Sequence, residues 1–213
     1  MVFNEAEEPR RRTLPSTLIL QGFPQHLVQL QDITAGNTVG AQHFIDLHAQ
    51  LSHETSQFAC DSLLWYWNRI GKQCYPDATS ILLLLDCGGS NAANRFIFKY
   101  YLQILADSIG IEIRVAHYPS YCSKYNRIER RLFPHITRAC SGMLFDTLDT
   151  VVNLMRKATT TTGLATTVNV IRRCYETGQV ATKEIKQNLK IRFDQLLPKW
   201  NYSAVPQLGT VIF

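Results

Sequence analysis

The run Ile81-Leu82-Leu83-Leu84-Leu85 constrains this chain more than any other segment. A continuous apolar run of this length is typical of a strand buried on both faces, as in parallel sheets. Asp86 follows the run directly, and Gly88-Gly89 then turns the chain. Because ligands of open α/β sheets bind beyond the carboxyl ends of the strands, Asp86 is well placed to hold a metal ion. The alternative role for Asp86 is to cap the following turn or helix.

Helical and strand patterns alternate around this run. A helix is expected from Ser52, which can cap it, to Gly71, and a second helix is expected to end at Gly110 after a cap at Ser90 or Asn91. Residues 111–115 alternate between apolar and polar and predict a strand. Further helices are expected from residue 123 and over residues 148–155 and 182–189. This order predicts an α/β domain whose parallel strands are joined by crossover helices.

Length and composition set the broad class. The chain has 213 residues, a net charge of +5 and six cysteines without a C-x-x-C pair. These values fit one soluble domain with reduced thiols in the cytoplasm, and the positive charge favours nucleic acid as a partner. No apolar stretch approaches the ~20 residues that span a bilayer, so no membrane partner is expected. Residues 1–51 show neither helical nor strand periodicity and are expected to form a loose, disordered arm.

A basic stretch with one acid lies downstream. From Arg114 to Arg138 the chain has six cations, and Glu129 is the only acid. If this stretch is helical, positions three and four residues from Glu129 hold no cation, so a local helical ion pair is excluded and an ion pair with a distant residue remains open. Glu129 is therefore a second candidate metal ligand.

Two or three convergent carboxylates suffice for Mg²⁺ or Mn²⁺, which take oxygen ligands and keep several waters. Two such ions about 4 Å apart can activate a water or a 3′-hydroxyl against a phosphodiester. The neighbouring cations are expected to hold DNA phosphates, and they are Lys124, Arg127, Arg130 and Arg131. His117 is expected to be a core or hydrogen-bonding residue and not a catalytic one.

Several motifs occur in a recognisable order: residues 85–91, 116–119, 123–133 and 159–164, and then Lys199-Trp200-Asn201-Tyr202. Together they resemble the DDE transposases of bacterial insertion sequences, and more narrowly the Rhodopirellula-type transposase DDE domain. The resemblance covers residues 52–202, and residues 203–213 are expected to form a tail.

The resemblance implies an RNase H-like fold, with Asp86 as the second catalytic acid and metal ligand and Glu129 as the third. It also implies Mg²⁺-dependent cleavage at element ends followed by strand transfer into target DNA. The family's first Asp lies on an earlier strand, and this chain is expected to begin after that strand. Neither Asp32 nor Asp46 is assigned to the missing role. Cys87 and Arg130 depart from the family pattern, which tends to have Gly and His there.

The leading hypothesis is that the chain is an N-terminally truncated transposase catalytic domain. This domain is expected to be inactive alone, because it lacks the first catalytic Asp. The alternative is a non-catalytic fragment that binds DNA, or forms oligomers with itself or a full-length transposase, and so regulates transposition. A third hypothesis is an RNase H-like nuclease in which a different acid completes the site.

Overall fold

The computed structural model describes residues 17–22, 44–50, 55–85, 87, 89–119, 122, 125, 133–144, 147–159, 165–171 and 173–207. Its main feature is a five-stranded sheet with the order β1-β3-β4-β7-β6. The strands are β1 (Thr17–Gly22), β3 (Ser80–Leu85), β4 (Glu112–His117), β7 (Asn201–Ala204) and β6 (Ile191–Phe193). β1, β3 and β4 are parallel, and β7 runs antiparallel to both β4 and β6.

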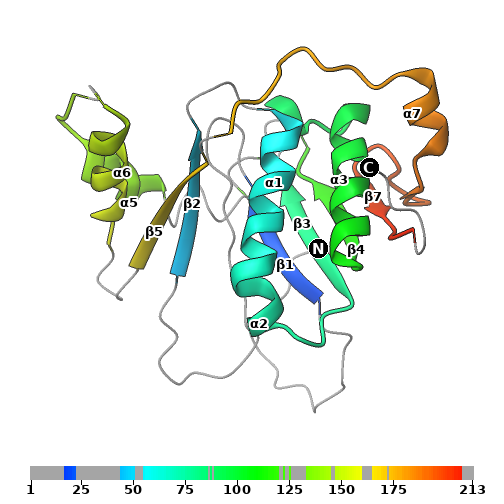
Figure 1. The fold of residues 1–213 in the computed structure, drawn as a ribbon, viewed down its shortest axis with the longest axis horizontal. Coiled ribbons are helices and arrows are strands. Elements are labelled where there is room, and N and C mark those ends of the chain that lie inside the picture. Colours follow the sequence, from blue (N-terminus) through cyan, green and yellow to red (C-terminus); the bar gives the residue numbers. More distant parts are fainter. Residues whose placement is uncertain are drawn as a thin grey trace.

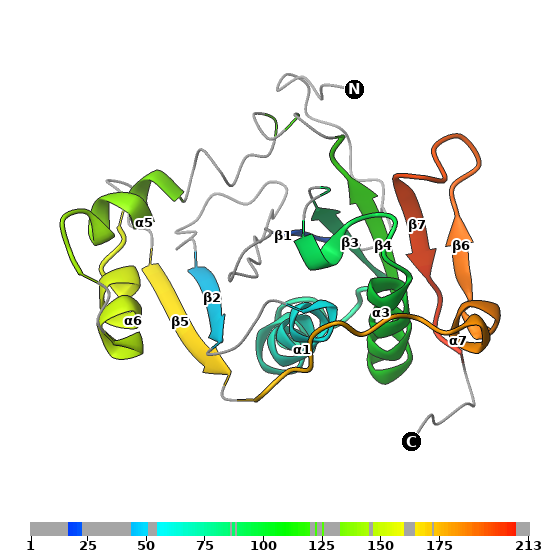
Figure 2. The ribbon, with the colours of Figure 1, turned by 90° about the horizontal axis from the view of Figure 1, so that it is seen from above.

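Helices α1 (Ser56–Tyr66) and α3 (Phe96–Ile109) lie side by side on one face of this sheet (Figures 1 and 2). α1 continues through a π-helical turn, Trp67–Gly71, into the short α2 (Lys72–Cys74). α3 connects the parallel strands β3 and β4, as the alternating pattern predicts. The mixed α/β architecture is consistent with an RNase H-like domain.

The aliphatic run forms β3, but only one of its faces is fully buried. Ile81, Leu83 and Leu85 lie in the core beneath α1 and α3, where at most 6% of each is exposed. Leu82 and Leu84 point to the other face and are half-buried. The prediction of a strand is confirmed, whereas equal burial of both faces is not found. The difference defines a helix-covered face and an open face of the sheet.

The helix ends follow from local chemistry. Thr55 caps α1, because its hydroxyl accepts a hydrogen bond from the Phe58 N–H at 3.1 Å. The first helix therefore starts later than predicted. The predicted cap, Ser52, lies outside the described residues. Gly110 has a φ of 70° and ends α3 as predicted, since glycine adopts the left-handed conformation without strain. The predicted caps Ser90 and Asn91 belong instead to a separate 3₁₀ turn, Gly89–Asn91, and Arg95 occupies the position before α3.

A smaller unit flanks the main sheet. β2 (Phe44–Gln50) and β5 (Ala165–Ile171) form a two-stranded parallel sheet. The helices α5 (Phe133–Cys140) and α6 (Leu148–Arg156) lie beside β5 (Figure 2). Their shared core contains Ile136, Val152, Ala158 and Val168. The helix expected over residues 148–155 is confirmed by α6.

Three strands lie in segments that the sequence predicts to be an arm or a tail, and β5 and β6 lie where no element is predicted. The pattern predicts no regular element in residues 1–51, whereas β1 and β2 lie there. Residues 203–213 are predicted to form a tail, whereas β7 occupies residues 201–204 between β4 and β6. Short strands of this kind are stabilised by neighbouring strands and not by their own periodicity.

The helix predicted over residues 182–189 is present as α7 (Lys183–Asn188), capped by Thr182. Within the described ranges, no helix has the length and apolar character that a membrane span requires.

Candidate functional site

All site residues predicted from the sequence lie outside the residues that the structure describes. They are Asp86, Glu129, Lys124, Arg127, Arg130 and Arg131. Their roles stay predictions. What the structure does describe is the strand end that immediately precedes Asp86.

The carboxyl ends of β3 and β4 lie next to each other. Leu85, the last residue of β3, pairs with His117, the last residue of β4. The Tyr118 N–H donates a hydrogen bond to the Leu85 carbonyl at 2.7 Å, and the His117 N–H donates to the Trp200 carbonyl at 2.9 Å. The chain position of Asp86 is thus the first one after a well-paired strand end, at the edge where α/β domains bind ligands.

His117 is held at this edge by Tyr202 of β7. The Tyr202 hydroxyl lies 3.0 Å from His117 Nε2, and both side chains are buried. Burial, and to a smaller extent the nearby thiols of Cys60 and Cys87, raises the pKa of Tyr202 above its ordinary value. The phenol therefore stays protonated at neutral pH and is able to donate this hydrogen bond. The expectation of a hydrogen-bonding histidine is confirmed.

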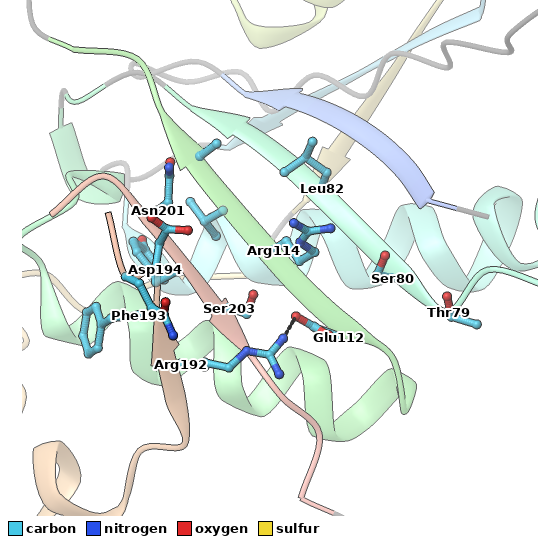
Figure 3. A pocket seen from close by; sticks show the side chains of 14 residues that line it. Thr79, Ser80, Leu82, Glu112, Arg114, Arg192, Phe193, Asp194, Asn201 and Ser203 are labelled. Carbon is cyan, nitrogen blue, oxygen red and sulfur yellow. Dashed lines mark hydrogen bonds and ion pairs between the residues drawn. The ribbon is translucent and has the colours of Figure 1, made fainter. Parts of the chain in front are cut away.

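A groove with a volume of about 780 Å³ opens on the face of the sheet opposite α1 and α3 (Figure 3). It is lined by residues of β3, β4, β6 and β7 and of the β6–β7 connection. Arg114 is exposed there, and its side chain makes no hydrogen bond or ion pair within the described part of the chain. The sequence pattern did not identify this groove, because β6 and β7 are not evident from periodicity.

Polar side chains cross the groove in one row. Ser203 of β7 pairs with Arg114 on one side and with Arg192 on the other. Arg192 also forms an ion pair with Glu112, with 2.5 Å between Nη2 and Oε1 (Figure 3). Arg114 is thus the cation of this row that is free to meet an anionic ligand.

The carboxylates in the described ranges do not themselves form a metal site, since no group of three or more His, Cys, Asp and Glu converges there. β1 lies beside β3, and its residues, 17–22, include no Asp or Glu. Asp46 lies on β2, which pairs with β5 and not with β3. The expected absence of the first catalytic Asp stays a prediction.

Comparison with curated proteins finds no match, and comparison with solved structures finds none either. A family model does match, over residues 41–206, and its description is the Rhodopirellula transposase DDE domain. The match covers most of the chain and includes β3, β4, β7 and the positions of Asp86 and Glu129. The chain therefore belongs to the Rhodopirellula-type transposase DDE domain family.

Proposed function

We propose that this chain is a catalytic domain for the Mg²⁺-dependent cleavage and strand transfer of an insertion sequence, with Asp86 and Glu129 as two of its metal-binding acids. The observation that carries the proposal is the pairing of Leu85 with His117, in a chain that belongs to this family. This pairing puts the chain position just before Asp86 at the carboxyl edge of two parallel strands, where a metal-binding carboxylate is useful.

The donor chemistry fits a divalent cation. Asp86 and Glu129 offer carboxylate oxygens, which suit Mg²⁺ and Mn²⁺, and the buried core beneath Leu85 and His117 supports one side of the strand edge. When bound, the cation stabilises charge on the oxygens of the phosphodiester that is cleaved. The chain itself orients the two carboxylates and holds the DNA in line with them.

DNA is the proposed partner, as both the element end and the target. Lys124, Arg127, Arg130 and Arg131 are proposed to contact phosphates, which gives affinity without sequence information. Arg114 in the groove is a fifth cation that an extended strand of DNA could reach, because it is exposed and unpaired within the described residues. Each phosphate contact releases counterions, so the affinity should fall steeply with salt.

A second candidate function is favoured by β1. This strand pairs with β3 in register from Thr17 to Gly22, and it carries no carboxylate. A site with two acids holds a metal pair poorly, because both the charge and the position of the ions suffer. The second candidate is therefore a DNA-binding or oligomerising regulator of a full-length transposase.

Cleavage of supercoiled DNA with Mn²⁺ separates the two candidates. The wild-type chain is compared with Asp86→Ala and Glu129→Ala, and the exposed acids Asp77 and Glu184 supply matched controls as Asp77→Ala and Glu184→Ala. Cleavage that is lost in the first two variants and kept in the controls supports the catalytic proposal. Salt-sensitive DNA binding without cleavage supports the regulator and contradicts the catalytic proposal.

A further inference from the structure

Lys99 is a buried cation of α3 that the function described so far does not use. Only 2% of the residue is exposed, and none of the described carboxylates forms an ion pair with it. Its ammonium group donates a hydrogen bond to the Ala93 carbonyl. Burying an unpaired charge is unfavourable unless other groups solvate it, so the surroundings of Lys99 require an explanation.

Three aromatic rings surround the ammonium. Lys99 Nζ lies 4.4 Å from the centroid of Tyr202, 5.3 Å from that of Phe96 and 6.0 Å from that of Phe193. These rings belong to β7, α3 and β6, so the cation joins the helix layer to the two antiparallel strands. A cation over an aromatic face is attracted by the ring quadrupole, and the attraction strengthens when water is excluded. Burial nevertheless lowers the pKa of Lys99 to about 8.

The contact continues from Lys99 to the end of β3. The Tyr202 ring packs on the ammonium, and the Tyr202 hydroxyl bonds to His117 Nε2 at 3.0 Å. His117 ends β4 and pairs with Leu85, the residue before Asp86. A continuous set of contacts therefore runs from the buried cation to the strand edge that precedes the proposed metal ligand.

We propose that Tyr202 and Lys99 are positioning residues, which hold His117 and thereby fix the paired ends of β3 and β4, directly before Asp86 in the sequence. The inference rests on the proposed function, because it assigns these two residues to the same site. A positioning role differs from ordinary core packing in its consequences. Loss of the Tyr202 hydroxyl should affect the strand edge and metal binding more than it affects the rest of the fold.

The variant Tyr202→Phe removes the bond to His117 and keeps the ring on Lys99. Tyr175→Phe is a matched control, since Tyr175 is also buried and its hydroxyl donates at 3.0 Å to Asp61 on α1. Both variants lose one buried hydroxyl with its hydrogen bond, at sites that belong to different parts of the core.

The first readout is amide hydrogen exchange, which does not depend on activity. In Tyr202→Phe, the His117 and Tyr118 amides should exchange about three- to tenfold faster relative to the Ala106 amide of α3, which corresponds to one lost hydrogen bond. Tyr175→Phe should leave this ratio unchanged. An equal change of all amides in both variants would overturn the proposal.

The second readout is the affinity for Mn²⁺, measured by calorimetric titration, with Asp86→Ala defining the binding that depends on Asp86. Tyr202→Phe and Lys99→Met should each weaken this binding about tenfold, the scale of a lost supporting contact, while Tyr175→Phe should not. Unchanged affinity in Tyr202→Phe overturns the proposal. If the wild-type chain shows no binding that depends on Asp86, the proposed metal site is wrong, and the exchange ratio alone decides whether Tyr202 holds the strand ends.

Discussion

Arg192 on β6 reaches Glu112 on β4 across the intervening strand β7, and 2.5 Å separates their charged atoms. The arginine side chain is 65% exposed and that of the glutamate 24% exposed. Because exposed ion pairs contribute only about 0–1 kcal/mol, Arg192→Ala should lower the free energy of unfolding by less than about 1 kcal/mol. Urea denaturation of Arg192→Ala, Glu112→Gln and the double variant measures the coupling. A coupling energy well above this range would show that the pair holds β6 in place.

Lys99 should make the stability of the fold depend on pH. Its pKa is lowered from 10.5 to about 8 by burial, so between these values the unfolded chain binds more protons than the folded chain. The free energy of unfolding should therefore rise with pH from about 8 to 10.5. Below pH 8 the full cost of burying the charged ammonium lowers the stability of the fold. Lys99→Met lacks this titration. Both proteins are denatured at pH 7, 8.5 and 10, and the free energy of unfolding of the wild type should rise relative to that of Lys99→Met as the pH increases. A difference between the two proteins that is the same at all three pH values would exclude a titration of Lys99 in this range.

An acid introduced on β1 should increase cleavage. Gln21 of β1 pairs with Leu84 of β3, and Leu84 lies two positions before Asp86 in the sequence. Gln21→Asp is therefore expected to supply a third carboxylate and to raise the rate of Mn²⁺-dependent DNA cleavage about tenfold or more. Gln21→Asn is the neutral control of the same shape. Equal rates in both variants would show that β1 does not serve the site.

The salt dependence of DNA binding should identify the cations that contact phosphate. Arg130→Ala and Arg131→Ala should each reduce the slope of log affinity against log salt by about 1. Arg69 is an exposed cation in the π-helical turn that follows α1, 5.2 Å from the centroid of the Trp65 ring, and Arg69→Ala should leave the slope unchanged. The slopes are obtained from fluorescence anisotropy at several salt concentrations. A similar loss in all three variants would indicate a general effect of charge.

The two faces of β3 should differ in their response to truncation. Leu83 is 2% exposed beneath α1 and α3, whereas Leu84 is half-buried on the open face. Leu83→Ala should cost about 2–5 kcal/mol of unfolding free energy, and Leu84→Ala distinctly less. Chemical denaturation provides the comparison. Equal costs would mean that the open face is covered as tightly as the helical one.

The sequence predicts the elements whose signals are local. The aliphatic run specifies β3, Gly110 ends α3, and Thr182 begins a short helix, because burial, left-handed backbone and side-chain capping act within a few residues. The position of Asp86 after a strand also follows from local pattern.

The strands β1 and β7 could not be predicted in this way, since each is held by a partner far along the chain. β1 pairs with β3, and β7 pairs with β4 and β6. The groove and the aromatic surroundings of Lys99 depend on β6 and β7, so they were also not predicted.

The bond between His117 and Tyr202 joins positions 85 residues apart. During synthesis, β4 therefore emerges from the ribosome long before its antiparallel neighbour exists. In that interval the outer edge of β4 can pair with any other extended chain, and such edges promote aggregation. The family motif at residues 199–202 leads into β7, so the synthesis of this motif should end the period in which the edge of β4 is unpaired.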